Sequence, residues 1–412
     1  MSAAPLDPAS PDAGHPLDGV LVADFSRVLA GPLATMTLAD LGARVIKVER
    51  PGVGDETRAW GPPYSTHPPQ ASTYFESINR TKESVTLDLG DTSDGGDRAL
   101  AFELARRADV VISNFKPGTM QRLGLGYDQV RAVNPGVIYC EISGFGSGAG
   151  ADLLGYDFVV QAVGGLMSIT GAPGEPTKAG VALVDVLTGK DATIGILAAL
   201  TARARTGHGE RIEVALLTSS LAAMVNQAQG ALETGRAPSG MGNRHPSIAP
   251  YETLHCKDAL IAIACGNDGQ FARLAEVLGE PTLATEPDFA TNAARVAHRD
   301  ALSERLEALL STDTADAWVL ACTAAGVPAG RVGTILDGVA LAERLGLDPV
   351  VDVAPDDAPR THQVRHPVRW TSYRTAVPTP PPALGEHDAA VHAWLRTPSD
   401  AADSTTETRA NR

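Results

Sequence analysis

The sequence predicts an α/β protein with a Rossmann-like large domain, built on a parallel sheet, and a smaller α+β domain. In the first half, short β-branched runs alternate with helix-like stretches, the pattern of parallel strands covered by helices on both faces. From about residue 233, two neighbouring strand-like runs are followed by helices, which is typical of a separate α+β unit. The length of 412 residues is sufficient for two lobes.

The first strand is expected at 20–25, followed by a turn at Gly31-Pro32 and an apolar helix through Leu41. The later elements of this half are strands at 43–48, 84–89, 109–113 and 136–142 and a helix at 98–108. Ligands of parallel sheets bind at the carboxyl ends of the strands. We therefore expect ligand contacts in the loops that follow Phe25, Val48, Ser113 and Ile142. The first of these loops lacks Gly-x-Gly-x-x-Gly, which argues against a dinucleotide dehydrogenase.

In the second half, the glycine-containing loop 240–246 precedes expected strands at 251–255 and 260–265 and helices at 270–278 and 299–310. Both ends of the chain are polar and lack a periodic pattern, so they are expected to be flexible. The predicted organisation is a tail at 1–16, the large domain at 17–225, the small domain at 226–330, a return to the large domain at 331–396, and a tail at 397–412.

Composition limits the classes of function. With 34 basic and 49 acidic residues the net charge is −15, which argues against a nucleic-acid partner. No segment approaches the roughly 18 apolar residues of a membrane span, and the N-terminus lacks a secretory pattern. The four cysteines show no metal-binding spacing, so reduced thiols are expected. These features predict a cytoplasmic protein with no metal and no membrane association.

Asp185 is the strongest candidate for a catalytic residue. It ends the apolar, strand-like run Gly180-Val-Ala-Leu-Val-Asp185, and Gly189 follows it. A carboxylate with the ordinary pKa of about 3.9 is an anion at neutral pH and can attack an activated acyl group without a separate base. The alternative is that Asp185 caps the helix expected at 190–200, because aspartate is a favoured capping residue.

Several separated motifs support the first alternative. They are Asp24-Phe-Ser-Arg-Val-Leu-Ala-Gly31-Pro32, Leu41-Gly-Ala-Arg-Val-Ile-Lys47-Val-Glu-Arg50-Pro51, Asn114-Phe115-Lys-Pro117-Gly118 and the segment from Gly155 to Gly189. In this order they resemble the family III coenzyme A transferases, which share their fold with the α-methylacyl-CoA racemases. The resemblance extends from about Leu17 to His387, which is most of the chain.

The resemblance implies a mechanism and a set of partners. Asp185 would attack the donor acyl-CoA to give a mixed anhydride and then an aspartyl-CoA thioester, from which CoA passes to an acceptor carboxylate. The expected partners are therefore an acyl-CoA, with coenzyme A as substrate and no tightly bound cofactor, and a carboxylic acid. The resemblance also implies a homodimer whose two chains are interlinked.

The resemblance further implies the CoA contacts, position by position. They are expected at Val28, Leu29, Ala30, Arg50, Leu87, Asn114, Phe115, Lys116, Arg122, Leu123, Tyr156 and Asp157. Arg50 would lie near the adenosine phosphates, and Tyr156 and Asp157 near the thioester. Each of these residues also has a structural alternative, core packing for Phe115 and a surface ion pair for Arg50. Leu29 replaces a glutamine of formyl-CoA transferase, which argues against formyl and oxalate as substrates.

The glycine-containing loop is the expected substrate loop, with Gly240, Gly242, Arg244 and His245 as its candidate residues. Its sequence is most similar to that of transferases that use succinyl-CoA and a dicarboxylate, and Arg244 is the candidate partner for the second carboxylate. A hairpin entry and a solvated arginine are the structural alternatives.

Two other functions are considered. A racemase would need a histidine where this chain has Tyr156, and a tyrosine with a pKa near 10 is a poor α-proton base. A non-catalytic CoA-binding protein would not need Asp185.

Overall fold

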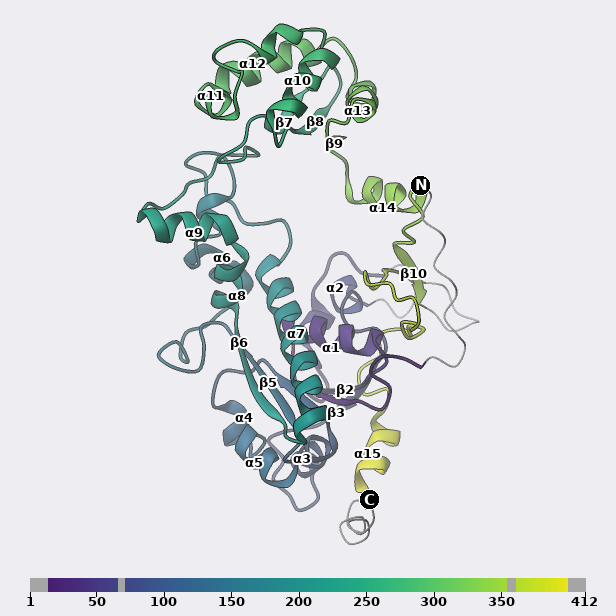
Figure 1. Ribbon diagram of the computed structural model, residues 1–412. Helices are drawn as coiled ribbons and strands as arrows, with labels where there is room; N and C mark the ends of the chain where they lie inside the picture. Colours follow the sequence, from purple (N-terminus) through teal and green to yellow (C-terminus); the bar gives the residue numbers. More distant parts are fainter. Residues whose placement is uncertain (1–13, 66–70, 354–360, 399–412) are drawn as a thin grey trace, which may run out of the picture. The chain divides into compact units, whose positions relative to one another are not determined.

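The computed structural model describes residues 14–65, 71–353 and 361–398 (Figure 1). The chain divides into two compact units, the first containing 1–164, 180–225 and 348–412 and the second containing 165–179 and 226–347. The predicted small domain, 226–330, falls within the second unit. The predicted tails fall largely outside the described residues, which include only 14–16 of the first and 397–398 of the second.

A parallel sheet of six strands forms the centre of the first unit, in the order β3-β2-β1-β4-β5-β6. The strands are β1 Leu21–Asp24, β2 Arg44–Glu49, β3 Lys82–Thr86, β4 Val110–Ser113, β5 Ile138–Ser143 and β6 Glu210–Ala215. This sheet confirms the predicted Rossmann-like α/β fold. Val22 of β1 pairs with Val45 on one side and with Val110 on the other, so the strand order reverses direction at β1. Ligands of open α/β sheets bind at such a reversal.

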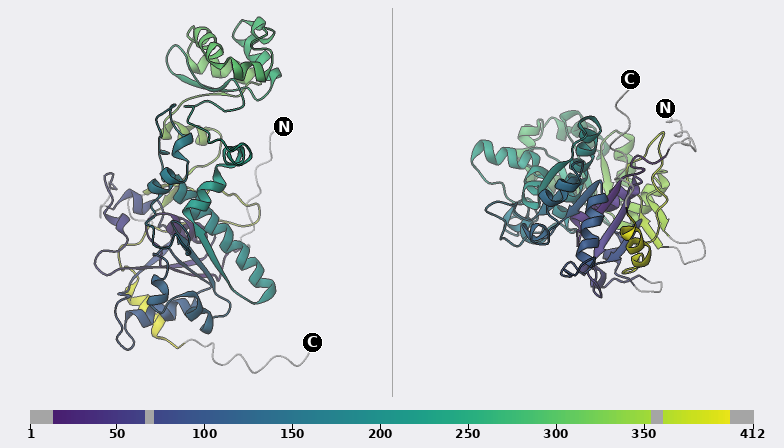
Figure 2. Two further views of the ribbon diagram at one scale, coloured as in Figure 1. Left: turned by 90° about the vertical axis from the view of Figure 1, so that its left-hand side faces the viewer. Right: turned by 90° about the horizontal axis from the view of Figure 1, so that it is seen from below.

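Helices connect the strands of this unit. They are α1 Ala30–Asp40, α2 Thr73–Glu76, α3 Asp97–Arg107, α4 Thr119–Arg122, α5 Tyr127–Val133, α6 Asp157–Val163, α7 Leu183–Thr206, α8 Leu216–Ala223 and α15 Asp388–Arg396, with a 3-10 turn η1 at Glu56–Ala59. Figure 2 shows α7 as the long teal helix beside the strands. α7 approaches the start of α1 closely at Gly189, where an added Cβ would lie 2.6 Å from the Ala30 carbonyl oxygen. Only glycine allows this approach.

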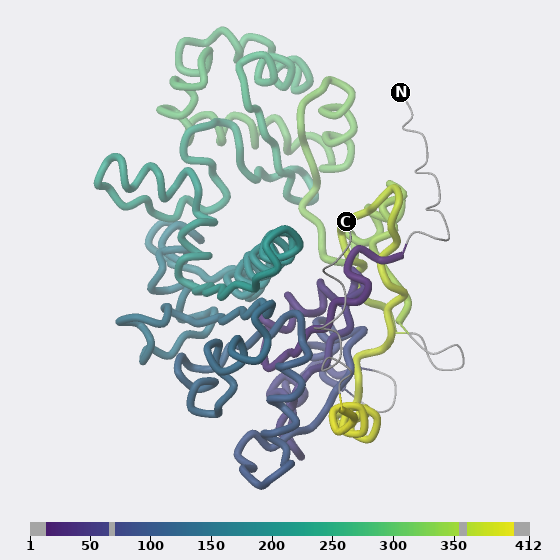
Figure 3. Tube along the Cα trace, turned by 60° about the horizontal axis from the view of Figure 1, so that its bottom comes forward, coloured from purple at the N-terminus to yellow at the C-terminus, as the bar shows by residue number. Residues whose placement is uncertain are grey.

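The C-terminal segment returns to the sheet, and Figure 3 shows it in yellow-green beside the purple N-terminal segment. The Ala376 amide donates to the Asp40 carbonyl at 2.9 Å, and Asp388, at the start of α15, accepts from the Thr86 amide at 2.6 Å. Val391 and Leu395 of α15 are buried in the same apolar core as Leu100 of α3. A two-stranded antiparallel sheet, β10 Val350–Val353 and β11 Thr361–Val364, belongs to this segment.

The second unit is the predicted α+β unit. Its antiparallel sheet has the order β7-β8-β9, with β7 at Tyr251–His255, β8 at Leu260–Ala264 and β9 at Ala329–Arg331. Its helices are α9 Val225–Thr234, α10 Asp268–Val277, α11 Asn292–Ala297, α12 Arg299–Leu310, α13 Ala315–Ala324 and α14 Ile335–Arg344, with 3-10 turns η2 Met167–Ile169 and η3 Pro281–Ala284. Its core is separate from that of the first unit and includes Ile261, Phe271 and Leu306.

One local prediction is wrong. The run 180–185 is not strand-like, because α7 begins at Leu183 and includes Asp185 in its first turn. The apolar run leads into a helix whose first turn packs inward, a pattern that six residues cannot distinguish from a buried strand. Strand β6 was not predicted. Among the described residues, no helix combines the length and apolar character needed to cross a bilayer.

Candidate active site

A cavity of about 570 Å³ lies at the carboxyl ends of β1 to β4. The loops after β2, β3 and β4 all contribute to its wall. It brings together four of the predicted CoA contacts, namely Arg50, Leu87, Phe115 and Leu123. The loop after β5, in contrast, lines a neighbouring cavity of about 430 Å³, which shares Phe115 with the first. The predicted ligand edge of the sheet therefore does carry a cavity large enough for a small molecule.

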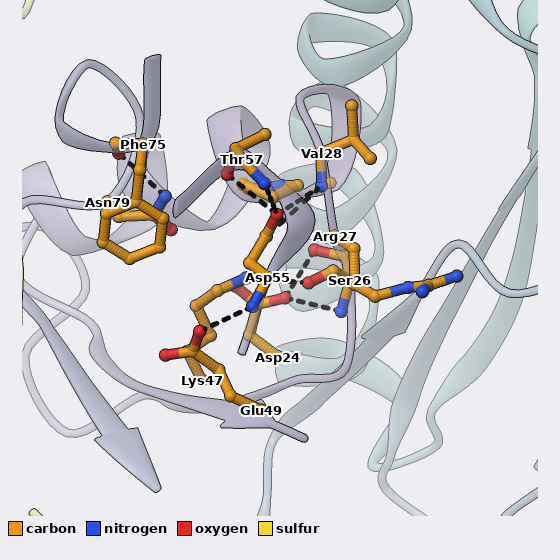
Figure 4. A network of polar contacts seen from close by, with 12 residues as sticks. Asp24, Ser26, Arg27, Val28, Lys47, Glu49, Asp55, Thr57, Phe75 and Asn79 are labelled. Atoms are coloured by element: carbon orange, nitrogen blue, oxygen red, sulfur yellow. Dashed lines mark hydrogen bonds and ion pairs between the residues drawn. The ribbon is translucent and has the colours of Figure 1, made fainter. Parts of the chain in front are cut away.

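A network of buried charges adjoins the cavity, and two of its members, Lys47 and Asp55, contribute to the cavity wall. Figure 4 shows part of this network. The Lys47 Nζ lies 2.9 Å from Asp55 Oδ2, and the Lys82 Nζ lies 3.3 Å from Asp24 Oδ2, with all four side chains 0% exposed. Burial opposes the charge on Asp55, but Lys47 and the bonds from Thr57 hold the pKa of this carboxyl below its usual value. Burial lowers the pKa of Lys82 to about 8 despite its contact with Asp24. Buried charges are stable only when paired and hydrogen-bonded in this way.

This network holds the loop after β1, which contains the predicted contact Val28. Asp24 accepts from the Ser26 amide at 2.9 Å, and Lys47 donates to the Ser26 carbonyl at 2.8 Å. Asn114 accepts from the Arg27 amide at 2.9 Å and donates to the Arg27 carbonyl at 2.6 Å. The side-chain amide of Asn114 thus fastens this loop to the one after β4.

Val28 has a φ of +69°, in the left-handed region that a β-branched residue avoids. Such a conformation costs on the order of 1–3 kcal/mol and persists only when its surroundings enforce it. Asp55 supplies one constraint, because its two carboxylate oxygens lie 3.3 and 3.2 Å from the Val28 amide nitrogen. The next residues, Leu29 and Ala30, are buried and form the N-terminal end of α1.

Asp185 lies in the first turn of α7, on the same face as Gly189 one turn later. Since Gly189 packs against Ala30, this face of α7 meets the start of α1 and the loop that precedes it. Asp157, at the start of α6, accepts from the Val184 amide at 2.8 Å and from the Asp185 amide at 3.2 Å. Asp157 therefore satisfies the first amides of α7. Asp185 is inside the helix and does not serve as its N-cap residue, which is Ala182.

The charge state of Asp185 differs from the sequence-based expectation. Burial, and secondly the neighbouring charge of Asp157, raise the pKa of Asp185 to about 7. An ordinary aspartate is fully ionised at neutral pH. The expectation was wrong on this point because it ignored the loss of hydration and the second carboxylate, neither of which is visible in the local sequence.

The remaining predicted CoA contacts lie at exposed positions of the first unit. Tyr156 is 62% exposed and immediately precedes α6. The Lys116 Nζ lies 2.8 Å from Asp152, and Arg122 donates to the Thr119 hydroxyl at 2.9 Å. Arg122 lines another cavity of about 450 Å³, which shares Leu123 with the first.

The predicted substrate loop belongs to the second unit. Gly240 has the Gly171 carbonyl oxygen 2.7 Å from where a Cβ would be, and the Gly242 amide donates to the same oxygen at 2.7 Å. Gly242 also has a φ of +64°. Arg244 is bonded to two carboxylates, 3.1 Å from Glu252 and 2.6 Å from Asp300. These bonds agree with a structural role for this arginine, and its binding of substrate stays a prediction.

His245 makes three contacts with two neighbours in the same unit, Tyr251 and Ser247. Its ring lies 5.2 Å from that of Tyr251, its amide donates to the Tyr251 carbonyl at 3.0 Å, and its Nδ1 accepts from the Ser247 amide at 3.1 Å. The side chain is thus fixed by packing. A role in substrate binding stays a prediction for His245 as well.

Three residues near the site were missed by the sequence analysis. Asp55 follows the turn Gly52-Val-Gly54, and this glycine-rich turn after a strand was the available signal. Burial, and then the negative charge of Asp185, raise the pKa of Tyr74 to about 12. Trp60 lines the cavity and stands edge-on to Tyr74, with ring centroids 5.2 Å apart. Nothing in the local sequence distinguished the two aromatic residues from core residues.

Comparisons with known proteins agree with this geometry. The family model of CoA-transferase family III matches residues 17–388. The chain is 42% identical to the succinate–glutarate CoA-transferase of Agrobacterium fabrum, over 94% of this chain and 97% of that protein. It is 44% identical to the acetyl-CoA:oxalate CoA-transferase of Acetobacter aceti, over 80% and 82% of the two chains. A crystal structure of a CaiB/BaiF family protein from Brucella suis superposes with a TM-score of 0.83 at 42% identity, covering 93% of this chain and 100% of that one.

The raised pKa of Asp185 predicts a pH-dependent stability effect. The protonated form is favoured in the folded state, so Asp185 destabilises the protein increasingly as the pH rises from its unfolded pKa of 3.8 to about 7. Asp185→Asn should therefore increase the free energy of unfolding at pH 8 by about 1–3 kcal/mol, allowing for partial solvent screening. Urea denaturation at pH 8 and below pH 4 measures the difference, which should vanish at the lower pH.

The matched control is Asp191→Asn, an exposed position on the same helix, which should have little effect at either pH. A destabilised Asp185→Asn protein at pH 8 would contradict the raised pKa.

Proposed function

The chain belongs to CoA-transferase family III, and we propose on this basis that it transfers CoA from succinyl-CoA to a dicarboxylate, with Asp185 as the nucleophile. The observation that carries the proposal is the position of Asp185. This carboxylate is in the first turn of α7, on the face that meets the start of α1, and it is largely removed from water. A carboxylate in such a place can attack a thioester while water is kept away.

The proposed reaction is close to thermoneutral overall, because the donor and acceptor acyl-CoA thioesters have similar energies. A carboxylate oxygen of Asp185 attacks the thioester carbonyl, CoA leaves as the thiolate, and a mixed anhydride forms. The thiolate then attacks the aspartyl carbonyl, which releases the donor acid and leaves an aspartyl-CoA thioester. The acceptor carboxylate attacks this thioester, CoA leaves again as the thiolate, and a second anhydride forms between Asp185 and the acceptor. Attack of the thiolate on the acceptor acyl carbonyl finally gives the new acyl-CoA and free Asp185.

The start of α1 supports the charge that develops in these steps. The first amides of a helix have no partner within the helix, and they stabilise negative charge. In the part of the chain that the structure describes, no bond engages the amides of Leu29 and Ala30, and Asp185 is on the helix face that packs there. These two amides are the proposed donors to the oxyanions, an interaction that contributes strongly to acyl transfer.

The cavity at the carboxyl edge of the sheet is the proposed CoA site. It offers apolar walls from Leu87, Phe115 and Leu123 and an exposed cation, Arg50, which suits an adenosine phosphate. For binding of the CoA phosphates, a cation near the cavity is more important than the negative net charge of the whole protein. The substrate contacts expected at Lys116, Arg122, Tyr156, Gly240, Gly242, Arg244 and His245 belong to this proposal as well.

A dicarboxylate of the glutarate kind is the proposed acceptor, and the name of the Agrobacterium relative supports it. Oxalate is the second candidate, because the chain is 44% identical to a transferase named for oxalate. Leu29 favours glutarate over oxalate. Formyl-CoA transferase carries a glutamine at this position, and its absence here argues against oxalate as a substrate. A panel of acceptor acids with succinyl-CoA and acetyl-CoA as donors distinguishes the two.

A homodimer of interlinked chains is also part of the proposal. Helix α14 supports it, because Ile335 and Leu336 of this helix are 86% and 79% exposed. An apolar helix face of this kind is typical of a surface that a second chain covers.

Asp185→Ala and Asp185→Asn should abolish CoA transfer, because neither side chain can form the anhydride. Both variants should keep the fold and bind CoA with an affinity near that of the wild type, as measured by calorimetry. Asp191→Asn is the control for a lost charge on α7 and should retain full activity. CoA transfer at the wild-type rate by Asp185→Ala would refute the assignment of Asp185 as the nucleophile.

Arg50→Ala should raise the KM for succinyl-CoA and leave the KM for the acceptor acid nearly unchanged. Loss of a charge-assisted phosphate bond costs about 1.5–3 kcal/mol, or roughly a 10- to 150-fold change in affinity. Arg205→Ala, an exposed arginine in the last turn of α7, is the matched control. An unchanged KM for succinyl-CoA would place Arg50 outside the nucleotide site.

The transferase and racemase reactions differ at the Cα–H bond of the acyl group. A racemase exchanges the α-proton of its substrate with solvent, whereas a transferase leaves that carbon unchanged. A 2-methylacyl-CoA incubated with the enzyme in deuterium oxide should therefore gain no α-deuterium, as followed by mass spectrometry. Deuterium incorporation without acyl exchange would show that the protein is a racemase and not a transferase.

A further inference from the structure

We propose that Asp55 is a positioning residue for CoA transfer: paired with Lys47, it holds the Val28 peptide in the left-handed conformation and thereby sets the start of α1 beside Asp185. The inference rests on the proposed function, because it concerns the same site. Asp55 is among the residues that line the cavity, but its side chain is 0% exposed and protein donors engage both of its oxygens, so we assign its effect to Val28 and not to a contact with substrate.

The ion pair spans the loop after β1. Lys47 Nζ donates to the Ser26 carbonyl oxygen at 2.8 Å and to Asp55 Oδ2 at 2.9 Å. Asp55 in turn accepts from the Val28 amide, whose nitrogen is 3.2 Å from the same Oδ2. One ion pair thus holds a carbonyl at one end of the loop and an amide at the other, two residues apart (Figure 4). The arrangement leaves little freedom for the peptide between them.

Val28 is the residue whose conformation needs this restraint. Its φ of +69° is unfavourable for a β-branched side chain, so the loop would relax to a negative φ if the restraint were removed. Leu29 follows directly, precedes the first helical residue and accepts from the Leu33 amide at 2.8 Å. A rotation at Val28 therefore moves the first turn of α1, including the two amides that are the proposed oxyanion donors.

Asp55 is suited to restrain Val28 because it is itself fixed from several directions. Its Oδ1 accepts from the Thr57 amide at 3.0 Å and from the Thr57 hydroxyl at 2.8 Å. Its own amide donates to Glu49 at 2.9 Å, and Glu49 is bonded to Arg58 through both of its oxygens, at 2.8 and 2.7 Å. The carboxylate is thus held by β2 and by the turn η1, and it transmits their rigidity to the loop.

A double-mutant cycle tests the proposal. Asp55→Asn should lower kcat for CoA transfer about tenfold, with a small change in KM for succinyl-CoA, because misplacement of reacting groups by a fraction of an ångström is costly. Val28→Gly accepts a positive φ without strain, so it needs less restraint. In the Val28→Gly background the loss caused by Asp55→Asn should shrink at least about threefold, a coupling that a merely structural role would not produce.

Thr81→Gly is the matched control, since Thr81 also has a positive φ, +62°, but lies in the turn before β3. It should leave the loss caused by Asp55→Asn unchanged. An equal loss in the Val28, Val28→Gly and Thr81→Gly backgrounds would overturn the proposal, as would wild-type kcat in Asp55→Asn.

Amide hydrogen exchange provides a measurement that does not depend on activity. The Val28 amide should exchange at least about tenfold faster in Asp55→Asn than in the wild type, because its acceptor is weakened. Unchanged exchange at Val28 would overturn the positioning role even if the enzyme transfers CoA. If the wild-type protein transfers no CoA, the proposed function is refuted. If the Val28 amide still exchanges faster in Asp55→Asn than in the wild type, the restraint of Asp55 on the loop is supported independently.

Discussion

The buried pair of Lys47 and Asp55 is the interaction on which the site depends. Removing two charges from water is expensive, and a pair of this kind is maintained only with further hydrogen bonds. Here those bonds come from the turn η1 and from the loop after β1. The cost of burial is therefore offset by contacts that also fix backbone. The charges contribute rigidity at the carboxyl edge of the sheet, where an all-apolar core would leave the loop free to move.

A second pair of ionisable groups, Asp157 and Asp185, lies at the start of α7. In contrast to Lys47 and Asp55, these two groups carry charge of the same sign. Asp157 is engaged by the first amides of the helix, whereas Asp185 has no buried cation beside it among the described residues. Burial and the neighbouring carboxylate therefore raise the pKa of Asp185. A carboxylate that is poorly solvated costs stability, and this cost is of the kind often found at catalytic positions. The buried charges of Lys47 and Asp55 are thus paired with each other, whereas the candidate nucleophile Asp185 has no cationic partner among the described residues.

Local periodicity was sufficient to predict five of the six strands of the parallel sheet. β1, β2, β4 and β5 are short runs of β-branched residues between turns, and helix α12 was predicted with its observed bounds. Periodicity failed at 180–185, where a helix start resembled a strand, and at β6, whose polar edge residues gave no signal. The candidate nucleophile and the cavity residues came from motifs. Their electrostatics could not, because the pKa of Asp185 and the role of Asp55 depend on groups that are distant in sequence and meet only in the folded chain.

Passage of CoA through a covalent bond to Asp185 can be tested by trapping that bond. The wild-type protein is incubated with succinyl-CoA, treated with hydroxylamine, digested and mapped by tandem mass spectrometry. We predict a hydroxamate on Asp185 that appears only when succinyl-CoA is present. Rapid CoA transfer under the same conditions with Asp185 unmodified, or with the modification on a different carboxylate, would contradict it.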